Sequence, residues 1–97
     1  MDRQEIIATL QPAIPELMER YGVLHLDLFG SFARGDAKPD SDVDFIVTFV
    51  GDPTFSRFMG LKEDLEALLL RDVDLVTSTG LRPRIREAVL AEMHRVA

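Results

Sequence analysis

The sequence predicts a small two-layer α+β domain, in which a mixed, three-stranded sheet carries flanking helices in the order α-β-β-α-β-α. Three short runs rich in β-branched and aromatic residues alternate with longer segments whose apolar residues recur at helical spacing. The chain has 97 residues, of which 46% are hydrophobic and 29% are charged. A chain of this size can bury one modest core, so we expect a single domain over residues 1–97.

The N-terminal segment has the signals of two short helices. Asp2 and Glu5 have the spacing of a capping box, and the apolar residues that follow recur at helical spacing. Pro12 and Pro15 cannot both lie inside one uninterrupted helix, so we expect a break between them. Gly22 is placed to end the second helix in a left-handed conformation.

The rest of the chain predicts three strands and two more helices. We expect strands at residues 23–29, 42–50 and 72–77, and helices at residues 54–70 and 82–96. The apolar stripe of the last helix consists of Ile85, Val89, Met93 and Val96. A loop of moderate length favours an antiparallel pair of the first two strands, whereas the helix before the third strand favours a parallel pair. This topology brings the end of the first strand and the starts of the other two to one edge of the sheet.

Aspartates gather at that edge. Asp42 and Asp44 are two apart on a strand, so their side chains share a face and their Cα atoms lie about 6.5 Å apart. Asp74 would enter from the neighbouring strand, about 5 Å away. Carboxylates so placed suit Mg²⁺, and two ions could activate an attacking oxygen and stabilise a leaving phosphate. The alternative is that aspartates at strand starts are solvated turn residues; we predict a metal site at all three.

A glycine-serine pair lies at the end of the first strand. A glycine in this place lets backbone N–H groups approach a phosphate closely. Ser31 adds a hydroxyl group and could cap a short helix through Phe32-Ala33-Arg34, whose positive end would face an anion. We therefore predict Gly30, Ser31 and Arg34 as phosphate-binding residues, although Arg34 could simply be solvated.

These motifs together resemble a known family. Gly30-Ser31, ten residues and then Asp42-Val43-Asp44 resembles the signature of the nucleotidyltransferase superfamily with the DNA polymerase β-type palm. The string LFGSFARGDAKPDSDVDFIV resembles its minimal nucleotidyltransferase subfamily, whose members are single domains of about this length. The family's third carboxylate, in a Val-Asp-Leu context, maps to Asp74 and leaves Asp72 as a flanking solvated residue.

The resemblance implies transfer of NMP from an NTP, ATP in the cases paired with toxins, with two Mg²⁺ ions and release of pyrophosphate. It implies that Asp42 and Asp44 bind the metal and that Asp74 completes the catalytic site and helps to deprotonate the acceptor. It further implies that Gly30 and Ser31 hold the triphosphate. Members are typically paired with a HEPN ribonuclease toxin, which they neutralise as antitoxins by adding AMP to a tyrosine.

Two other functions stay open. The chain could be a non-catalytic antitoxin or subunit whose acidic edge masks a partner's active site, or it could transfer NMP to a small molecule. Retention of the three carboxylates with the glycine-serine pair favours the enzyme, and the short chain argues against a small-molecule acceptor. The basic cluster Arg82, Arg84 and Arg86 could contact phosphates or a partner, or could be a solvated helix start.

Bulk properties exclude several classes of function. The formal net charge of −6 makes the chain poorly suited to hold a long nucleic acid. No run of about 18 apolar residues and no signal-peptide pattern is present, so we expect no membrane association. The absence of cysteine fits a reducing cytoplasm, where we expect the protein to act.

Overall fold

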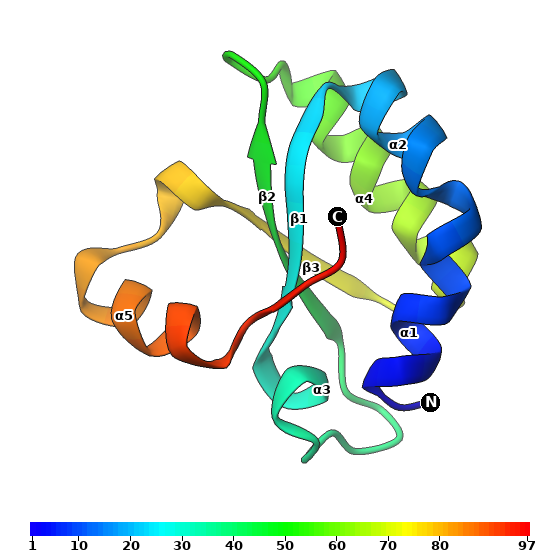
Figure 1. The fold of residues 1–97 in the computed structure, drawn as a ribbon, viewed down its shortest axis with the longest axis vertical. Coiled ribbons are helices and arrows are strands. Elements are labelled where there is room, and N and C mark those ends of the chain that lie inside the picture. Colours follow the sequence, from blue (N-terminus) through cyan, green and yellow to red (C-terminus); the bar gives the residue numbers. More distant parts are fainter.

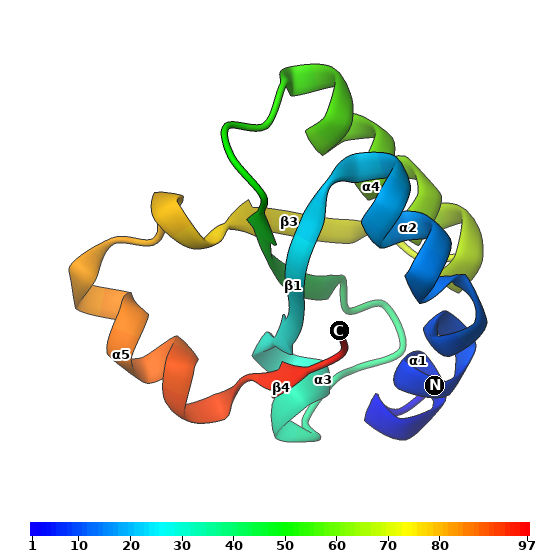
Figure 2. The same ribbon diagram turned by 45° about the horizontal axis from the view of Figure 1, so that its top comes forward.

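The fold is a four-stranded mixed sheet with helices on both faces, and the computed structural model describes all residues from 1 to 97 (Figure 1). The elements are α1 (Arg3–Leu10), η1 (Gln11–Ala13), α2 (Ile14–Tyr21), β1 (Val23–Phe29), α3 (Gly30–Arg34), β2 (Val43–Phe49), α4 (Phe55–Leu69), β3 (Val73–Thr77), η2 (Ser78–Gly80), α5 (Pro83–Glu92) and β4 (His94–Arg95). The strand order is β3-β2-β1-β4. Helices α1, α2 and α4 cover one face, and α5 lies over the other (Figures 1 and 2). None of the helices is both long and apolar enough to cross a bilayer.

The N-terminal helices form as expected. The Asp2 side chain caps α1 by accepting a hydrogen bond of 2.9 Å from the Glu5 N–H group. The single 3₁₀ turn η1, which contains Pro12, separates α1 from α2, and Pro15 lies in the first turn of α2. Gly22 ends α2 with a φ of +65°, a conformation that glycine adopts without steric cost.

The hydrophobic core lies between the sheet and the layer of α1, α2 and α4. Alternate residues of the strands point into it, so that Leu26, Leu28, Phe45 and Val47 are almost completely buried. The helices contribute a second set of fully or nearly fully buried side chains, which are Ile6, Leu10, Leu17, Leu61, Leu65 and Leu69. The strand residues between the core residues therefore face the opposite side of the sheet, which carries the polar groups.

The predicted strand directions are confirmed. Strand β1 is antiparallel to β2, and β2 is parallel to β3. In this register Phe29 lies opposite Asp44, and Asp44 lies beside Asp74. The end of β1 and the starts of β2 and β3 thus meet at one edge of the sheet, as the topology required.

The C-terminal prediction was wrong, because the last helix ends at Glu92 and not at residue 96. The backbone becomes extended at Met93 (ψ 150°), and β4 then pairs with β1. The free edge of β1 explains the change, since its N–H and C=O groups need partners: Leu26 N–H donates to Ala97 O at 3.0 Å and Val96 N–H to Leu26 O at 2.8 Å. The sheet therefore has four strands, where three were expected.

The apolar stripe proposed for the last helix fails for the same reason. Val89 is buried, but Ile85 is 50% exposed on α5. Val96 is buried, but it follows β4 and does not belong to a helix. His94 lies on β4 and is exposed. Helix α5 therefore contributes a single buried residue, Val89, and is weakly anchored compared with α4.

Candidate active site

The site is built at the corner between β1 and α3. Gly30 is the first residue of α3 and has a φ of +74°, which side-chain-bearing residues rarely adopt. A Cβ atom at this position would lie 2.1 Å from Asp44 Oδ2 and 2.9 Å from Asp44 Cγ. The Asp44 carboxylate is therefore packed against the backbone of Gly30, and only glycine leaves room for it.

Ser31 does not cap α3, contrary to expectation. The helix begins one residue earlier, with Phe29 at the capping position and no side-chain hydrogen bond there. Ser31 is half-buried in the first turn, and its carbonyl oxygen accepts from the N–H groups of Gly35 (2.9 Å) and Asp36 (3.0 Å). Its hydroxyl is thus not committed to the helix cap and stays beside the Gly30 corner.

Asp44 and Asp74 form the centre of the acidic edge. They are neighbours across β2 and β3, Asp44 half-buried and Asp74 exposed. Burial, as the largest cause, and the negative charges of Asp74 and Asp42 together raise the pKa of Asp44 from 3.8 to about 6, whereas the charge of Arg34 opposes the shift. Negative charge is therefore concentrated around a carboxylate that water cannot fully stabilise.

Asp42 lies one residue before β2 and is exposed. It borders a hollow that Arg71 and Asp72 also line, yet it remains close enough to Asp44 to affect its pKa. No three acidic or histidine side chains of the chain surround one common point. The oxygen donors nevertheless fit a hard divalent cation such as Mg²⁺, which takes few protein carboxylates and completes its shell with water and phosphate.

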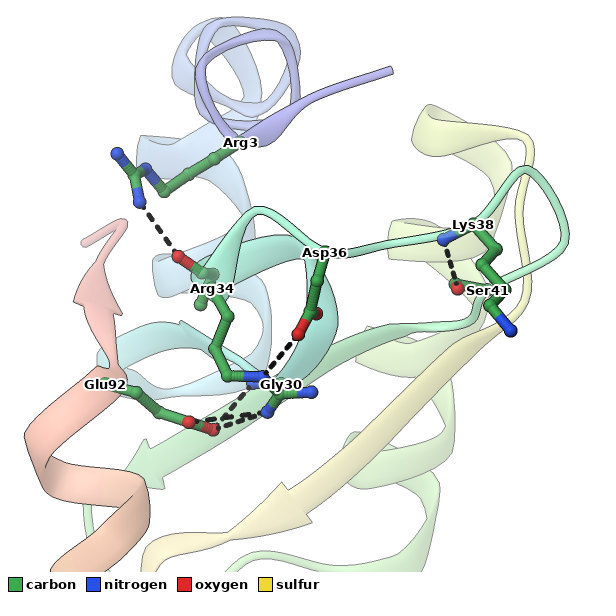
Figure 3. A network of polar contacts seen from close by, with 8 residues as sticks. Arg3, Gly30, Arg34, Asp36, Lys38, Ser41 and Glu92 are labelled. Atoms are coloured by element: carbon green, nitrogen blue, oxygen red, sulfur yellow. Dashed lines mark hydrogen bonds and ion pairs between the residues drawn. The ribbon is translucent and has the colours of Figure 1, made fainter.

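An ion-pair network joins the Gly30 corner to the end of α5 (Figure 3). Gly30 N–H donates to Glu92 Oε1 at 3.2 Å, and Arg34 Nη1 contacts both carboxylate oxygens of Glu92 at 3.2 and 3.3 Å. Arg34 Nε donates to Asp36 Oδ2 at 3.2 Å, and these hydrogen bonds with Asp36 and Glu92 raise the pKa of Arg34. Arg34 is thus tied to the Gly30 corner by ion pairs and is not a freely solvated residue.

Sequence reasoning missed Glu92 altogether. The expected last helix continued to residue 96 and included Glu92 in its interior. Glu92 is 58 positions after Arg34 in the sequence, and no local motif marks it. Its position follows from the early end of α5, which turns the chain back toward β1. Only the pairing of β4 with β1 could have indicated that Glu92 approaches the Gly30 corner.

The sheet face beside the carboxylates is hollowed under α5. The cavity, of about 280 Å³, is lined by Ile46 and Thr48 of β2 and by Arg86 and Met93 on the α5 side. Ile46 is two residues beyond Asp44 and so lies on the same face. The three clustered arginines are all exposed at the start of α5, and only Arg86 of them borders this cavity.

Comparisons with known proteins identify relatives of this chain. The family model of the nucleotidyltransferase domain matches residues 12–96. The protein adenylyltransferase MntA of Thermococcus cleftensis is 46% identical over 90 residues, which are 93% of this chain and 91% of that protein. A solved structure named as a minimal nucleotidyltransferase is 41% identical, covers 97% of this chain and 95% of the other, and has a TM-score of 0.77.

A more distant match is a solved complex of a tri-AMPylated Shewanella oneidensis HEPN toxin with an MNT antitoxin. It is 19% identical, covers 94% of this chain and 71% of the other, and has a TM-score of 0.67. At that identity the match supports the fold alone. The fold is therefore shared with proteins whose sequences have diverged widely.

Proposed function

This chain belongs to the nucleotidyltransferase domain family, and we propose that it transfers AMP from ATP to a side chain of a partner protein. The single observation that carries the proposal is the packing of the Asp44 carboxylate against Gly30, with Asp74 directly beside it. In this proposal the corner binds phosphate and the adjacent carboxylate pair binds the cation, so the two functions would lie in contact. The name of the T. cleftensis relative supports adenosine as the nucleoside and protein as the acceptor.

The corner residues bind the triphosphate in this proposal. The N–H group of Gly30 and the guanidinium of Arg34 are donors that already hold a carboxylate, and the Ser31 hydroxyl lies in the same turn. Asp42, Asp44 and Asp74 would hold Mg²⁺, which neutralises phosphate charge and orients the reacting oxygen when it is bound.

The reaction is a substitution at the α-phosphorus of ATP. The acceptor hydroxyl oxygen forms the new P–O bond, the bond to the β-phosphate oxygen breaks, and pyrophosphate leaves. Asp74, exposed at the rim of the site, accepts the hydroxyl proton.

The proposed partner is a HEPN-type toxin, which the chain would inactivate in the cytoplasm as an antitoxin. The support is the S. oneidensis complex, in which an MNT antitoxin of this fold is bound to an AMPylated HEPN toxin. Two alternatives predict other behaviour: a binding antitoxin would neutralise without transfer, and an enzyme for small molecules would ignore the toxin. The acidic character of the chain, with a net charge of −6, would serve either of the protein-directed functions.

The test is a labelling assay with α-³²P-ATP, Mg²⁺ and the product of the neighbouring gene. We expect the label to appear on that product with the wild-type chain and to disappear with the double variant Asp42→Asn/Asp44→Asn. Asp72→Asn is the matched control, because Asp72 is an exposed aspartate at the same edge that we do not assign to the site. Full neutralisation by the double variant without any labelling would instead identify a binding antitoxin.

A further inference from the structure

The carboxylate of Glu92 lies where the proposed function requires phosphate oxygens. It accepts a hydrogen bond from Gly30 N–H and forms a forked contact with the Arg34 guanidinium (Figure 3). These are the two positively polarised donors that the phosphate-binding corner offers. A carboxylate and a phosphate oxygen compete for the same kind of donor, because both are anionic oxygen acceptors.

The contact of the Glu92 carboxylate with Gly30 and Arg34 forms in an unfavourable electrostatic environment. Asp44 lies against the same glycine, and Asp36 shares the Arg34 guanidinium. A third negative group is repelled there unless its contacts with Gly30 and Arg34 compensate. An anion is therefore held at the corner by specific donors and not by a generally positive surface.

Helix α5, which carries Glu92, is weakly attached to the rest of the fold. Val89 is its one buried residue, and its first turns are exposed to solvent. The link between Glu92 and α3 is partly exposed, with 46% of the Arg34 side chain and 26% of the Glu92 side chain accessible. Partly exposed ion pairs are weak, so a multiply charged ligand can displace Glu92 from Arg34.

We propose that Glu92 is an internal competitor for the triphosphate, so that nucleotide binding releases α5 from the Gly30 corner. The inference rests on the proposed function, since it concerns occupation of the same site. The ligand class that displaces Glu92 is a nucleoside triphosphate, whose oxygens take over Gly30 N–H and Arg34. Because β4 follows α5 directly, release of α5 would change the conformation of the C-terminal part of the chain when a nucleotide fills the site.

The first test compares nucleotide affinity in Glu92→Gln with that of the wild type. Titration calorimetry with ATP and Mg²⁺ should give a Kd about fivefold lower for the variant, which corresponds to the loss of one exposed charge-assisted contact. Glu87→Gln is the matched control, since it removes the same charge from an exposed position of α5 without touching the corner. We expect its Kd to stay within about twofold of the wild type. Equal affinities of Glu92→Gln and Glu87→Gln, or a weaker Glu92→Gln, would overturn the proposal.

The second test follows α5 itself by amide hydrogen exchange. Adding ATP and Mg²⁺ to the wild type should accelerate exchange in α5, whereas in Glu92→Gln the exchange should already be fast before addition. Slower exchange of wild-type α5 on nucleotide binding contradicts release. If the wild type neither binds ATP nor labels its partner, the proposed function fails as well. If it does both while Glu92→Gln behaves like the wild type, only the competition is rejected.

Discussion

Adding a single methyl group at Gly30 tests whether the close contact between Gly30 and Asp44 is required for activity. In Gly30→Ala the new Cβ atom would lie 2.1 Å from Asp44 Oδ2, whereas an ordinary contact begins at 3.4 Å. The difference, 3.4 − 2.1 = 1.3 Å, is the distance that the carboxylate or the corner must move. A misplacement of about 1 Å in an active site can lower the rate about 100-fold, so we expect a loss of that order in AMP transfer.

The same substitution also strains the backbone. Alanine in the left-handed region costs about 1–2 kcal/mol, and a domain of this size loses roughly 4–8 °C in Tm per kcal/mol. Gly35→Ala is the matched control, because Gly35 has a similar φ of +84° but nothing within 4 Å of the position of its Cβ. Both variants should lose similar stability in a thermal melt, and only Gly30→Ala should lose the transfer activity. Equal activity of the two variants would refute the steric account of this pair.

Three further predictions concern charge and packing. Because the pKa of Asp44 is raised from 3.8 to about 6, Asp44 adds stability at low pH that is lost as the pH rises through that window. Asp44→Asn should therefore raise the Tm more at pH 8 than at pH 4, and an equal gain at both would contradict the raised pKa. Arg95→Ala leaves the buried Asp27 carboxylate without its 3.1 Å ion pair and should lower the free energy of unfolding by about 1–3 kcal/mol in urea denaturation, whereas the exposed control Arg84→Ala should change it little. Phe45→Ala empties a completely buried position and should lower that free energy by about 3–5 kcal/mol; a loss below about 1 kcal/mol would mean that Phe45 is not a core residue.

Local patterns predicted most of the fold because the relevant interactions are short in range. Proline at residues 12 and 15 interrupts helix hydrogen bonding wherever it occurs, and glycine at residue 22 ends a helix by its own conformational freedom. The types of connection between the strands set the strand directions. The meeting of Asp44 and Asp74 followed from those directions.

The C-terminal region was misread because its conformation depends on a distant partner. Residues 93–96 continue a helical spacing of apolar residues, but pairing with the free edge of β1 outweighs the few helical hydrogen bonds they would gain. Propensity is a weak signal when tertiary hydrogen bonds compete with it. Val96 is therefore buried from a position after β4, where a place on the last helix was expected.

The order of residues by itself determined that a glycine corner, Asp44 and Asp74 come to one edge of a mixed sheet, because the types of connection between strands and the alternation of side chains follow from the local chain. Only the tertiary structure decided which groups fill that corner. The packing of Asp44 against Gly30 and the approach of Glu92 to Arg34 depend on how β2 and the end of α5 lie in space. Contacts between residues so far apart arise from the whole packed fold, and no local spacing encodes them.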